Sequence, residues 1–457
     1  MSQSDPPSAR WTRLSNRLAA WQATRGRPTT RFVFWPEPRS IGHAARGRQL
    51  CAGRVALAGN LVEAPGSLIW NIDPPDAAFA AEMHGFGWLD DLVAAGDAEA
   101  RATAQSWLMA WIARFGRGHG PGWTPDLAGR RLIRWTCHAE FLLRGQDAAA
   151  SRAVLRSLAQ QTRFVARRWR AAPTGRARIE ALAGLVHAGV SLDGMASHAE
   201  AARAALAQEA PACIDATGGI ASRNPETLLE MFTLLTSAAQ VLGETGRRAA
   251  EAHWRAVERI APCLRTLRHA DGGLARFHGG GRGCDGRLDA ALAASGVKAQ
   301  ARGGRAMGYA RLGRGRTSVI VDAAPPPGGA AADGAHASTL AFELTSGRRQ
   351  LIVNCGSGAG FGSDWRLAGR ATLSHSTLVL AGGSSARLGH DPHHPGRLAE
   401  APRDVPIKVS HPPGGPRFEG GHDGYLRSHG LCHVRRLDLS ADGRALTGED
   451  VLLARGP

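Results

Sequence analysis

Residues 334–356 read GAHASTLAFELTSGRRQLIVNCG, and this stretch has the pattern of a β-hairpin. Two apolar, partly alternating runs, TLAFEL and QLIVNCG, lie on either side of the polar sequence SGRR, as is typical of two strands joined by a short turn. An imidazole, His336, precedes the first run. The stretch therefore predicts strand pairing in the C-terminal half, with a histidine at the mouth of the hairpin.

The rest of the chain divides into two halves of different periodicity. From about residue 78 to 268, apolar residues recur at three and four in segments broken by Gly, Pro and Asp, which predicts amphipathic helices. After residue 286, short β-prone runs such as STLAFELTS, RRQLIVNCG and HSTLVLAGG predict an antiparallel sandwich. The glycine-rich HGGGRGCDG (278–286) lacks the context of a phosphate-binding loop and is expected to be a flexible domain connection.

The sequence thus predicts an α+β chain of several domains. We expect an irregular lead-in over residues 1–77, packed on a helical domain over 78–285, and an antiparallel β-sandwich over 286–457.

The net charge of +17 favours an anionic partner or reflects a coding bias, and the composition leaves both explanations open. Nearly all of the basic residues are arginines, because the only lysines are Lys298 and Lys408. Arginine's planar fork suits carboxylate, sulfate and phosphate groups. No nucleic-acid-binding motif accompanies the basic residues, so nucleic acid is not the expected partner.

Cysteine usage and hydropathy exclude several classes of protein. The seven cysteines are scattered and lack C-x-x-C spacing, so neither a disulfide framework nor a zinc knuckle is predicted. The first residues, MSQSDPPSARWTRLSNRLAAWQATRGR, lack the apolar core of a secretory signal. No run of about 18 apolar residues occurs, so no membrane span is expected.

Four motifs together resemble the heparinase II/III-like proteins, relatives of polysaccharide lyases. They are HGFGWLDDL (84–92), WTPDLAGRRLIRW (123–135), the opening stretch and LSHSTLVLAG (373–382). The resemblance covers nearly the whole chain. It implies an incomplete α/α toroid followed by a β-sandwich, and β-elimination on an acidic, uronate-containing polysaccharide, with or without sulfate groups, in the cleft between them.

The same resemblance bears on localisation and on the chain's C-terminus. Such proteins usually work in the cell envelope or periplasm, which is the localisation that the resemblance implies. The absence of a visible signal is compatible with a mis-assigned start, an unusual export route or residence in the cytoplasm. Their β domain continues with further strands, so LTGEDVLLARGP (446–457) is expected to end within a truncated sandwich. The sequence does not predict an oligomeric state.

The residues that carry elimination in active relatives are replaced here. Those relatives place an Asn-His pair on one toroid helix and a Tyr-His pair on a later one. The matching positions in this chain hold Arg176, Ala177, Thr227 and Leu228. The two tyrosines, Tyr309 and Tyr425, lie outside the toroid helices, so neither matches the tyrosine acid/base of the relatives.

Other groups are candidates for the three tasks of the reaction. Elimination needs a group that neutralises the uronate carboxylate, a base and an acid. Arg223 and Asn224, at the start of a predicted helix, are candidates for the first task, and His336 is the candidate base. Asn224 is also expected to cap that helix, with Pro225 in its first turn. Two hypotheses follow: a lyase that uses these groups, or a non-catalytic anionic-glycan-binding or cell-envelope assembly protein.

The resemblance also implies a structural zinc in the β domain. The positions that match a His-Asp-His ligand set are His336, Asn354 and His375. Two imidazoles suit zinc, whereas an asparagine amide is a weaker ligand than a carboxylate.

Overall fold

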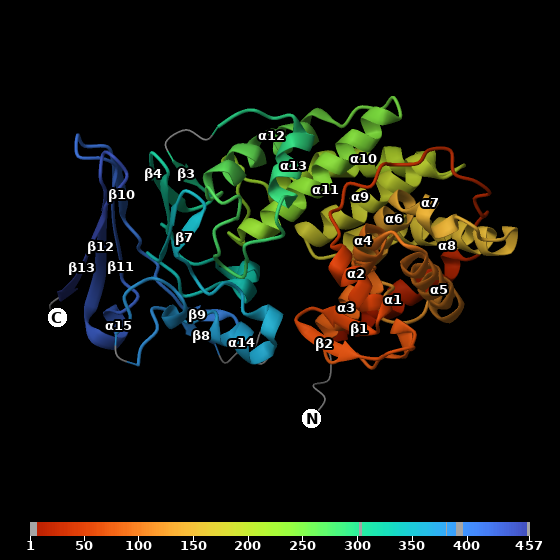
Figure 1. The fold of residues 1–457 in the computed structure, drawn as a ribbon, viewed down its shortest axis with the longest axis horizontal. Coiled ribbons are helices and arrows are strands. Elements are labelled where there is room, and N and C mark those ends of the chain that lie inside the picture. The colour runs from red at the N-terminus through yellow and green to blue at the C-terminus, as the bar shows by residue number, and fades with distance from the viewer. Residues whose placement is uncertain (1–6, 301–303, 381, 390–395, 455–457) are drawn as a thin grey trace. The chain divides into compact units, whose positions relative to one another are not determined.

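The computed structural model describes residues 7–300, 304–380, 382–389 and 396–454, and the chain forms two compact units (Figure 1). Unit 1 comprises Met1–Ala212 and Thr233–Arg255, and unit 2 comprises Cys213–Phe232 and Ala256–Pro457. Helices α11 (Pro225–Glu244) and α12 (Glu251–Thr266) each contribute residues to both units. Within the described ranges, no helix is long and apolar enough to cross a membrane.

Unit 1 is built mainly of helices. They are α1 (Pro7–Ala23), α2 (Ala44–Cys51), α3 (Ala77–Gly85), α4 (Trp88–Ala95), α5 (Ala98–Phe115), α6 (Pro125–Cys137), α7 (Ala139–Leu143), α8 (Ala148–Arg168), α9 (Arg176–Ser191) and α10 (Ala196–Cys213). The side chains of Asp76, Asp97 and Asp147 cap α3, α5 and α8, because each accepts a hydrogen bond from a free N–H of the first turn.

The first 77 residues are more regular than the sequence predicted. They hold α1, α2 and a hairpin of β1 (Arg54–Leu57) and β2 (Asn60–Glu63). The apolar face that α1 buries consists of small alanines, and α2 buries only Gly47 and Leu50. Helix α2 therefore lacks the broad apolar stripe by which a buried helix is recognised in a sequence, whereas the large apolar residues of α1 lie on its exposed side.

Two glycines allow helices α6 and α9 to pack closely. A Cβ on Gly129 would lie 2.6 Å from the Ala181 Cα, and one on Gly184 would lie 2.5 Å from the Gly129 Cα. Both distances are far below van der Waals contact, so the backbones meet where neither helix has a side chain.

Unit 2 contains two antiparallel sheets that face each other. One has the strand order β3-β4-β5-β6-β7 and the other β10-β11-β12-β13. The strands are β3 (Arg305–Ala306), β4 (Tyr309–Arg314), β5 (Thr317–Asp322), β6 (Phe342–Ser346), β7 (Arg349–Ile352), β10 (Ile407–Ser410), β11 (Arg417–His422), β12 (Leu431–Leu439) and β13 (Leu446–Ala454). A short pair, β8 (Arg387–Leu388) and β9 (Leu398–Glu400), and the helices α13 (Arg287–Ser295), α14 (Ser363–Ala368) and α15 (Leu426–His429) complete it.

The core of the sandwich comes from the inner faces of both sheets. Its buried residues are Ala310, Leu312, Val319, Val321, Ala323, Leu340, Phe418, Leu437 and Leu439. The hairpin predicted from residues 334–356 is present as β6 and β7, which pair through Ser346 and Arg349. The α+β class, with a helical toroid before an antiparallel sandwich, is therefore confirmed.

One predicted strand is wrong. The run HSTLVLAGG (375–383) forms no strand in its described residues. Side chains satisfy its backbone instead: the Ser376 N–H donates to Asn354 Oδ1 at 3.1 Å, and the Tyr425 hydroxyl donates to the Leu378 carbonyl at 2.8 Å. β-Branched composition predicts a strand only where a ladder partner is present.

The α6–α9 contact predicts opposite outcomes for two glycine substitutions. Gly129→Ala should lower the free energy of unfolding by about 1–3 kcal/mol, because the new methyl group meets the backbone of α9. Gly243→Ala, on helix α11 with no atom near its Cβ, should raise it by up to about 1 kcal/mol. Urea unfolding of the two variants checks both values, and equal stability would contradict the close packing.

Candidate functional site

A buried ion pair between Arg223 and Asp322 lies at the centre of the candidate site in unit 2. Every N–H donor of the Arg223 guanidinium has a protein acceptor. Besides Asp322 Oδ1, the acceptors are the carbonyl oxygens of Met307, Gly308, Ala324 and Pro325, at 2.7–3.2 Å. The Tyr309 hydroxyl donates to the Arg223 carbonyl at 2.5 Å. The guanidinium therefore has no donor left for a substrate carboxylate.

The backbone of Arg223 is held in an uncommon conformation. Its φ of 51° lies in the left-handed region, which side chains other than glycine adopt at a cost. The hydrogen bonds of the Arg223 guanidinium and of the Arg223 carbonyl stabilise the backbone in this conformation.

Asp322 gathers polar groups from three segments. Its Oδ2 accepts a hydrogen bond from the Ser338 hydroxyl at 2.7 Å and faces His278 Nε2 at 3.3 Å. Burial alone would raise the pKa of Asp322, but Arg223 and His278 outweigh it and lower the pKa to about 2. The carboxylate is therefore ionised throughout the physiological range.

His336 and His375 form a close pair of imidazoles. The Nδ1 of His336 lies 3.2 Å from the Nε2 of His375, and both rings are buried. The backbone N–H of His336 donates to His278 Nδ1 at 3.1 Å, which places the His278 proton on Nε2, toward Asp322. Burial lowers the pKa of all three imidazoles, that of His375 to about 4. Near pH 7 they are neutral, and each is a weaker base than an exposed histidine.

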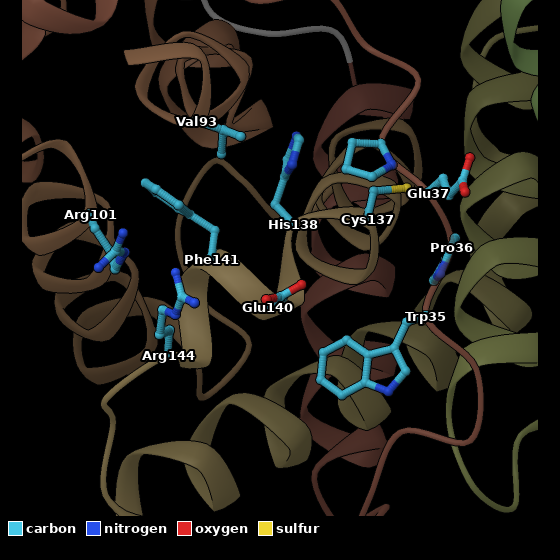
Figure 2. A pocket seen from close by; sticks show the side chains of 11 residues that line it. Trp35, Pro36, Glu37, Val93, Arg101, Cys137, His138, Glu140, Phe141 and Arg144 are labelled. Atoms are coloured by element: carbon cyan, nitrogen blue, oxygen red, sulfur yellow. The ribbon is translucent and has the colours of Figure 1, made fainter. Parts of the chain in front are cut away.

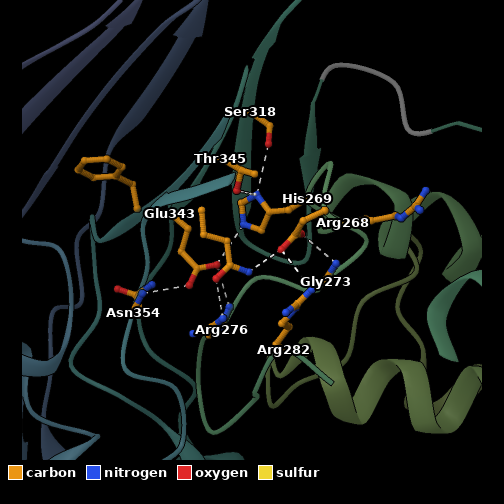
Figure 3. Close-up of polar contacts among 12 residues, drawn as sticks. Arg268, His269, Gly273, Arg276, Arg282, Ser318, Glu343, Thr345 and Asn354 are labelled. Carbon is orange, nitrogen blue, oxygen red and sulfur yellow. Dashed lines mark hydrogen bonds and ion pairs between the residues drawn. The ribbon is translucent and has the colours of Figure 1, made fainter. Parts of the chain in front are cut away.

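Asn354 belongs to a neighbouring polar network around Glu343 (Figure 3). Glu343 Oε1 accepts from the Asn354 backbone N–H at 3.0 Å, and Oε2 lies 3.0 Å from His269 Nε2. The Asn354 Oδ1 accepts from the Ser376 N–H and hydroxyl at 3.1 and 3.2 Å. This network fastens the segment around His269 to strand β6.

The predicted zinc ligands supply an incomplete set. The 3.2 Å between the two imidazole nitrogens is close to the roughly 3.3 Å expected for two nitrogens on one zinc ion. The Asn354 Oδ1, however, is occupied by Ser376. In the part of the chain that the structure describes, no three His, Cys, Asp or Glu side chains form a metal-binding group. Zinc binding therefore stays a prediction.

Asn224 caps helix α11, as its place in the sequence predicted. Its Oδ1 accepts from the backbone N–H groups of Glu226 and Thr227 at 2.9 and 3.0 Å. Gly280 packs on this cap, since a Cβ there would lie 2.8 Å from Asn224 Oδ1, and the Gly281 N–H donates to Glu226 at 2.8 Å. These contacts anchor the start of the 278–286 stretch, which was expected to be a flexible connection.

The two tyrosines do not supply an acid/base group in place of the missing one. The Tyr309 hydroxyl is buried against Arg223, and burial raises its pKa well above the usual value. The Tyr425 hydroxyl donates to a carbonyl, and burial raises its pKa as well. Both hydroxyl groups act as structural donors.

Unit 1 contains a separate cavity of about 490 Å³ (Figure 2). Its lining includes the aromatic rings of Trp35 and Phe141 and the guanidinium groups of Arg101 and Arg144. Two acidic side chains, Glu37 and Glu140, also line it, and the Arg101 guanidinium lies 5.5 Å from the Phe141 ring centroid. His138 also lines it, fixed by a 2.9 Å contact between its Nε2 and Asp90 Oδ1.

Asp90 is held by several donors beside this cavity. Arg134 and the Ser40 hydroxyl donate to it in addition to His138. Burial would raise its pKa, but Arg134 and His138 lower it to about 2. The Nδ1 of His138 is buried and has no hydrogen-bond partner among the residues that the structure describes.

Several of these groups were not predicted from the sequence. His278 was placed in a flexible loop, Asp322 at the end of a strand received no role, and the cavity residues were passed over. Asp90 lay in the motif HGFGWLDDL and His278 opened the stretch HGGGRGCDG, but neither residue was given a role. A histidine directly before a run of glycines was the one available signal for His278, because such glycines often let a backbone approach another closely.

Comparisons with known proteins agree on the fold. Residues 297–457 match the model of the heparinase II/III-like C-terminal domain. FtsZ-localized protein C of Caulobacter vibrioides is 32% identical over 430 residues, which are 91% of this chain and 72% of that protein. The chain belongs to the heparinase II/III-like family.

Solved structures extend the likeness to the whole architecture. A crystal structure of heparinase III superimposes with a TM-score of 0.66 at 14% identity, covering 95% of this chain and 74% of that one. The heparan sulfate lyase HepC from Pedobacter heparinus gives a TM-score of 0.52 at 15% identity, covering 98% and 74%. At such low identity, these heparinase-fold neighbours support the fold alone.

The buried imidazoles predict a loss of stability in mild acid. His375 has an ordinary pKa of 6.5 and a folded pKa of about 4, so between these values only the unfolded chain takes up its proton. Stability should therefore fall by about 3 kcal/mol for this group as the pH drops from 6.5 to 4. Asp322, whose pKa is lowered from 3.8 to about 2, should add a further loss below pH 4.

Urea unfolding across this pH range measures the effect. His375→Gln should flatten the slope between pH 6.5 and 4, whatever its effect on stability at pH 7. His411→Ala, at an exposed position, should keep the wild-type slope. An unchanged slope in His375→Gln would show that the ring titrates normally in the folded chain.

Proposed function

We propose that this protein binds an acidic glycan and does not perform rapid β-elimination. The proposal rests on one observation: the candidate catalytic groups are engaged in structural contacts or buried. The donors of Arg223 are taken up by the fold, and Asn224 caps a helix. His336 is buried, with a pKa well below the usual value. Membership of a lyase-related family supports a glycan as the ligand.

The unit 1 cavity is the glycan contact that we propose (Figure 2). Trp35, which is 49% exposed, offers a face on which a sugar ring can stack. Arg101 and Arg144 offer paired N–H donors to a uronate carboxylate or a sulfate group. Glu37 and Glu140 also line the cavity, so in this proposal the arginines bind the acidic group of the sugar and the two carboxylates accept hydrogen bonds from its hydroxyl groups.

The relative named FtsZ-localized protein C supports the second candidate function, that of an envelope assembly protein. A protein of this kind would hold a glycan rather than cut it, which agrees with the engaged catalytic groups. The cell envelope accordingly stays our proposal for where the protein works.

Glycan binding without turnover is the expected result. Incubation with uronate polymers should give no rise in the ultraviolet absorbance of unsaturated uronate, while calorimetry detects binding that weakens with salt. The double variant Arg101→Ala/Arg144→Ala should bind about tenfold or more weakly. Arg152→Ala, an exposed arginine on helix α8, is the matched control and should bind normally.

Two outcomes would contradict this proposal. An absorbance rise that His336→Ala abolishes would restore the lyase hypothesis. Equal binding by the double variant and the control would remove the cavity as the contact.

Zinc binding can be tested independently of glycan. If His336 and His375 hold zinc, the purified protein should contain about one metal ion per chain by mass spectrometry. The double variant His336→Ala/His375→Ala should then lose it, and His411→Ala should retain it. Metal-free wild-type protein that also fails to take up added zinc would end the prediction.

A further inference from the structure

Helix α1 (Pro7–Ala23) buries one face in unit 1. That face consists of Ala19, Ala20, Ala23 and Asn16. The Asn16 Oδ1 accepts a hydrogen bond from Arg168 Nε of helix α8 at 2.8 Å. The helix is therefore fixed to its unit through small and polar residues.

A second face of α1 is apolar and lies in solvent. Trp11 is 70% exposed, Leu14 56%, Leu18 55% and Trp21 46%. Their spacing of three, four and three places them on one side of the helix. Large apolar side chains gathered in this way mark an interaction surface, whereas isolated ones need no explanation.

Basic residues flank this apolar face. Arg10, Arg13 and Arg17 are exposed and recur at the same spacing one position earlier, so they form a stripe beside it. Arg25, just beyond the helix, lies with its guanidinium 3.7 Å from the Trp21 ring centroid. Residues 6–36 contain six arginines and no acidic residue.

We propose that this face of α1 docks the protein on an anionic membrane surface. Tryptophan and leucine enter the boundary between headgroups and acyl chains, where the indole ring suits both environments. The arginines then meet lipid phosphates at the level of the headgroups. A helix of 17 residues lies in this plane over about 25 Å.

An anionic bilayer fits the face better than a second copy of the chain does. A second copy brings an identical row of arginines against the first, and like charges repel. A bilayer offers acyl chains to the apolar row and lipid phosphates to the arginines.

Vesicle flotation tests the proposal. Wild-type protein should float with vesicles of phosphatidylcholine and phosphatidylglycerol and should remain unbound with phosphatidylcholine alone. High salt should release it, because the Debye length falls to about 3 Å at 1 M. Trp11→Ala/Trp21→Ala should reduce the bound fraction about tenfold or more. Arg10→Glu/Arg17→Glu should reduce it with the apolar residues intact.

A matched control removes two exposed aromatic rings elsewhere. Phe361 and Trp365, 77% and 64% exposed in unit 2, can be changed to alanine, and this variant should float like wild type. All substituted side chains are exposed, and circular dichroism checks that each variant is folded. Failure of the wild type to float with anionic vesicles, or flotation that survives both α1 variants, would overturn the proposal. Self-association without lipid that Trp11→Ala/Trp21→Ala abolishes would assign the face to a second copy instead.

Discussion

The buried pair of Arg223 and Asp322 is the interaction on which the organisation of unit 2 depends. It joins the segment before helix α11 to the end of strand β5, residues that are 99 positions apart in the chain. Removing two charges from water is costly. The cost is offset here because four carbonyl groups accept hydrogen bonds from the remaining N–H groups of Arg223, and Ser338 and His278 contact the second carboxylate oxygen of Asp322. Loss of either partner would leave an uncompensated buried charge, so the segment 213–232 folds with the sandwich.

This arrangement explains how the fold persists without the residues that active relatives use. A catalytic group needs a hydrogen-bond donor or acceptor that is available to the substrate. The polar atoms of Arg223 and Asn224 instead form hydrogen bonds within the protein. The imidazoles of His278, His336 and His375 have been drawn into the same buried cluster, where low polarity keeps them neutral. The cluster contains the residue types of a catalytic site, but its side chains are buried and bound to other protein groups, as in a structural core.

The sequence predicted those features that repeat locally. The helices followed from apolar residues at three and four, and the β6–β7 hairpin followed from alternation around SGRR. The cap at Asn224 was predicted because a cap is made by neighbours in the chain. What could not be predicted depends on distant partners. Gly280 packs against Asn224, and Asp322 pairs with Arg223. In both cases the partner is distant in the sequence, so neither role could be predicted from the neighbouring residues.

The same distinction divides the arginines that give the chain its charge. Arg130, Arg223 and Arg435 are themselves buried, and each forms an ion pair with an acidic partner that compensates its charge. Such residues contribute little to the field outside the protein. Of the arginines in residues 6–36, Arg31 lies 3.5 Å from Asp193 in an exposed ion pair, and Arg10, Arg13 and Arg17 lie along α1 beside an exposed apolar stripe. A coding bias explains why arginine was used in both places, but it does not explain why charge and tryptophan are gathered on one open helix face. The anionic membrane surface that we propose as the partner of α1 accounts for the two together.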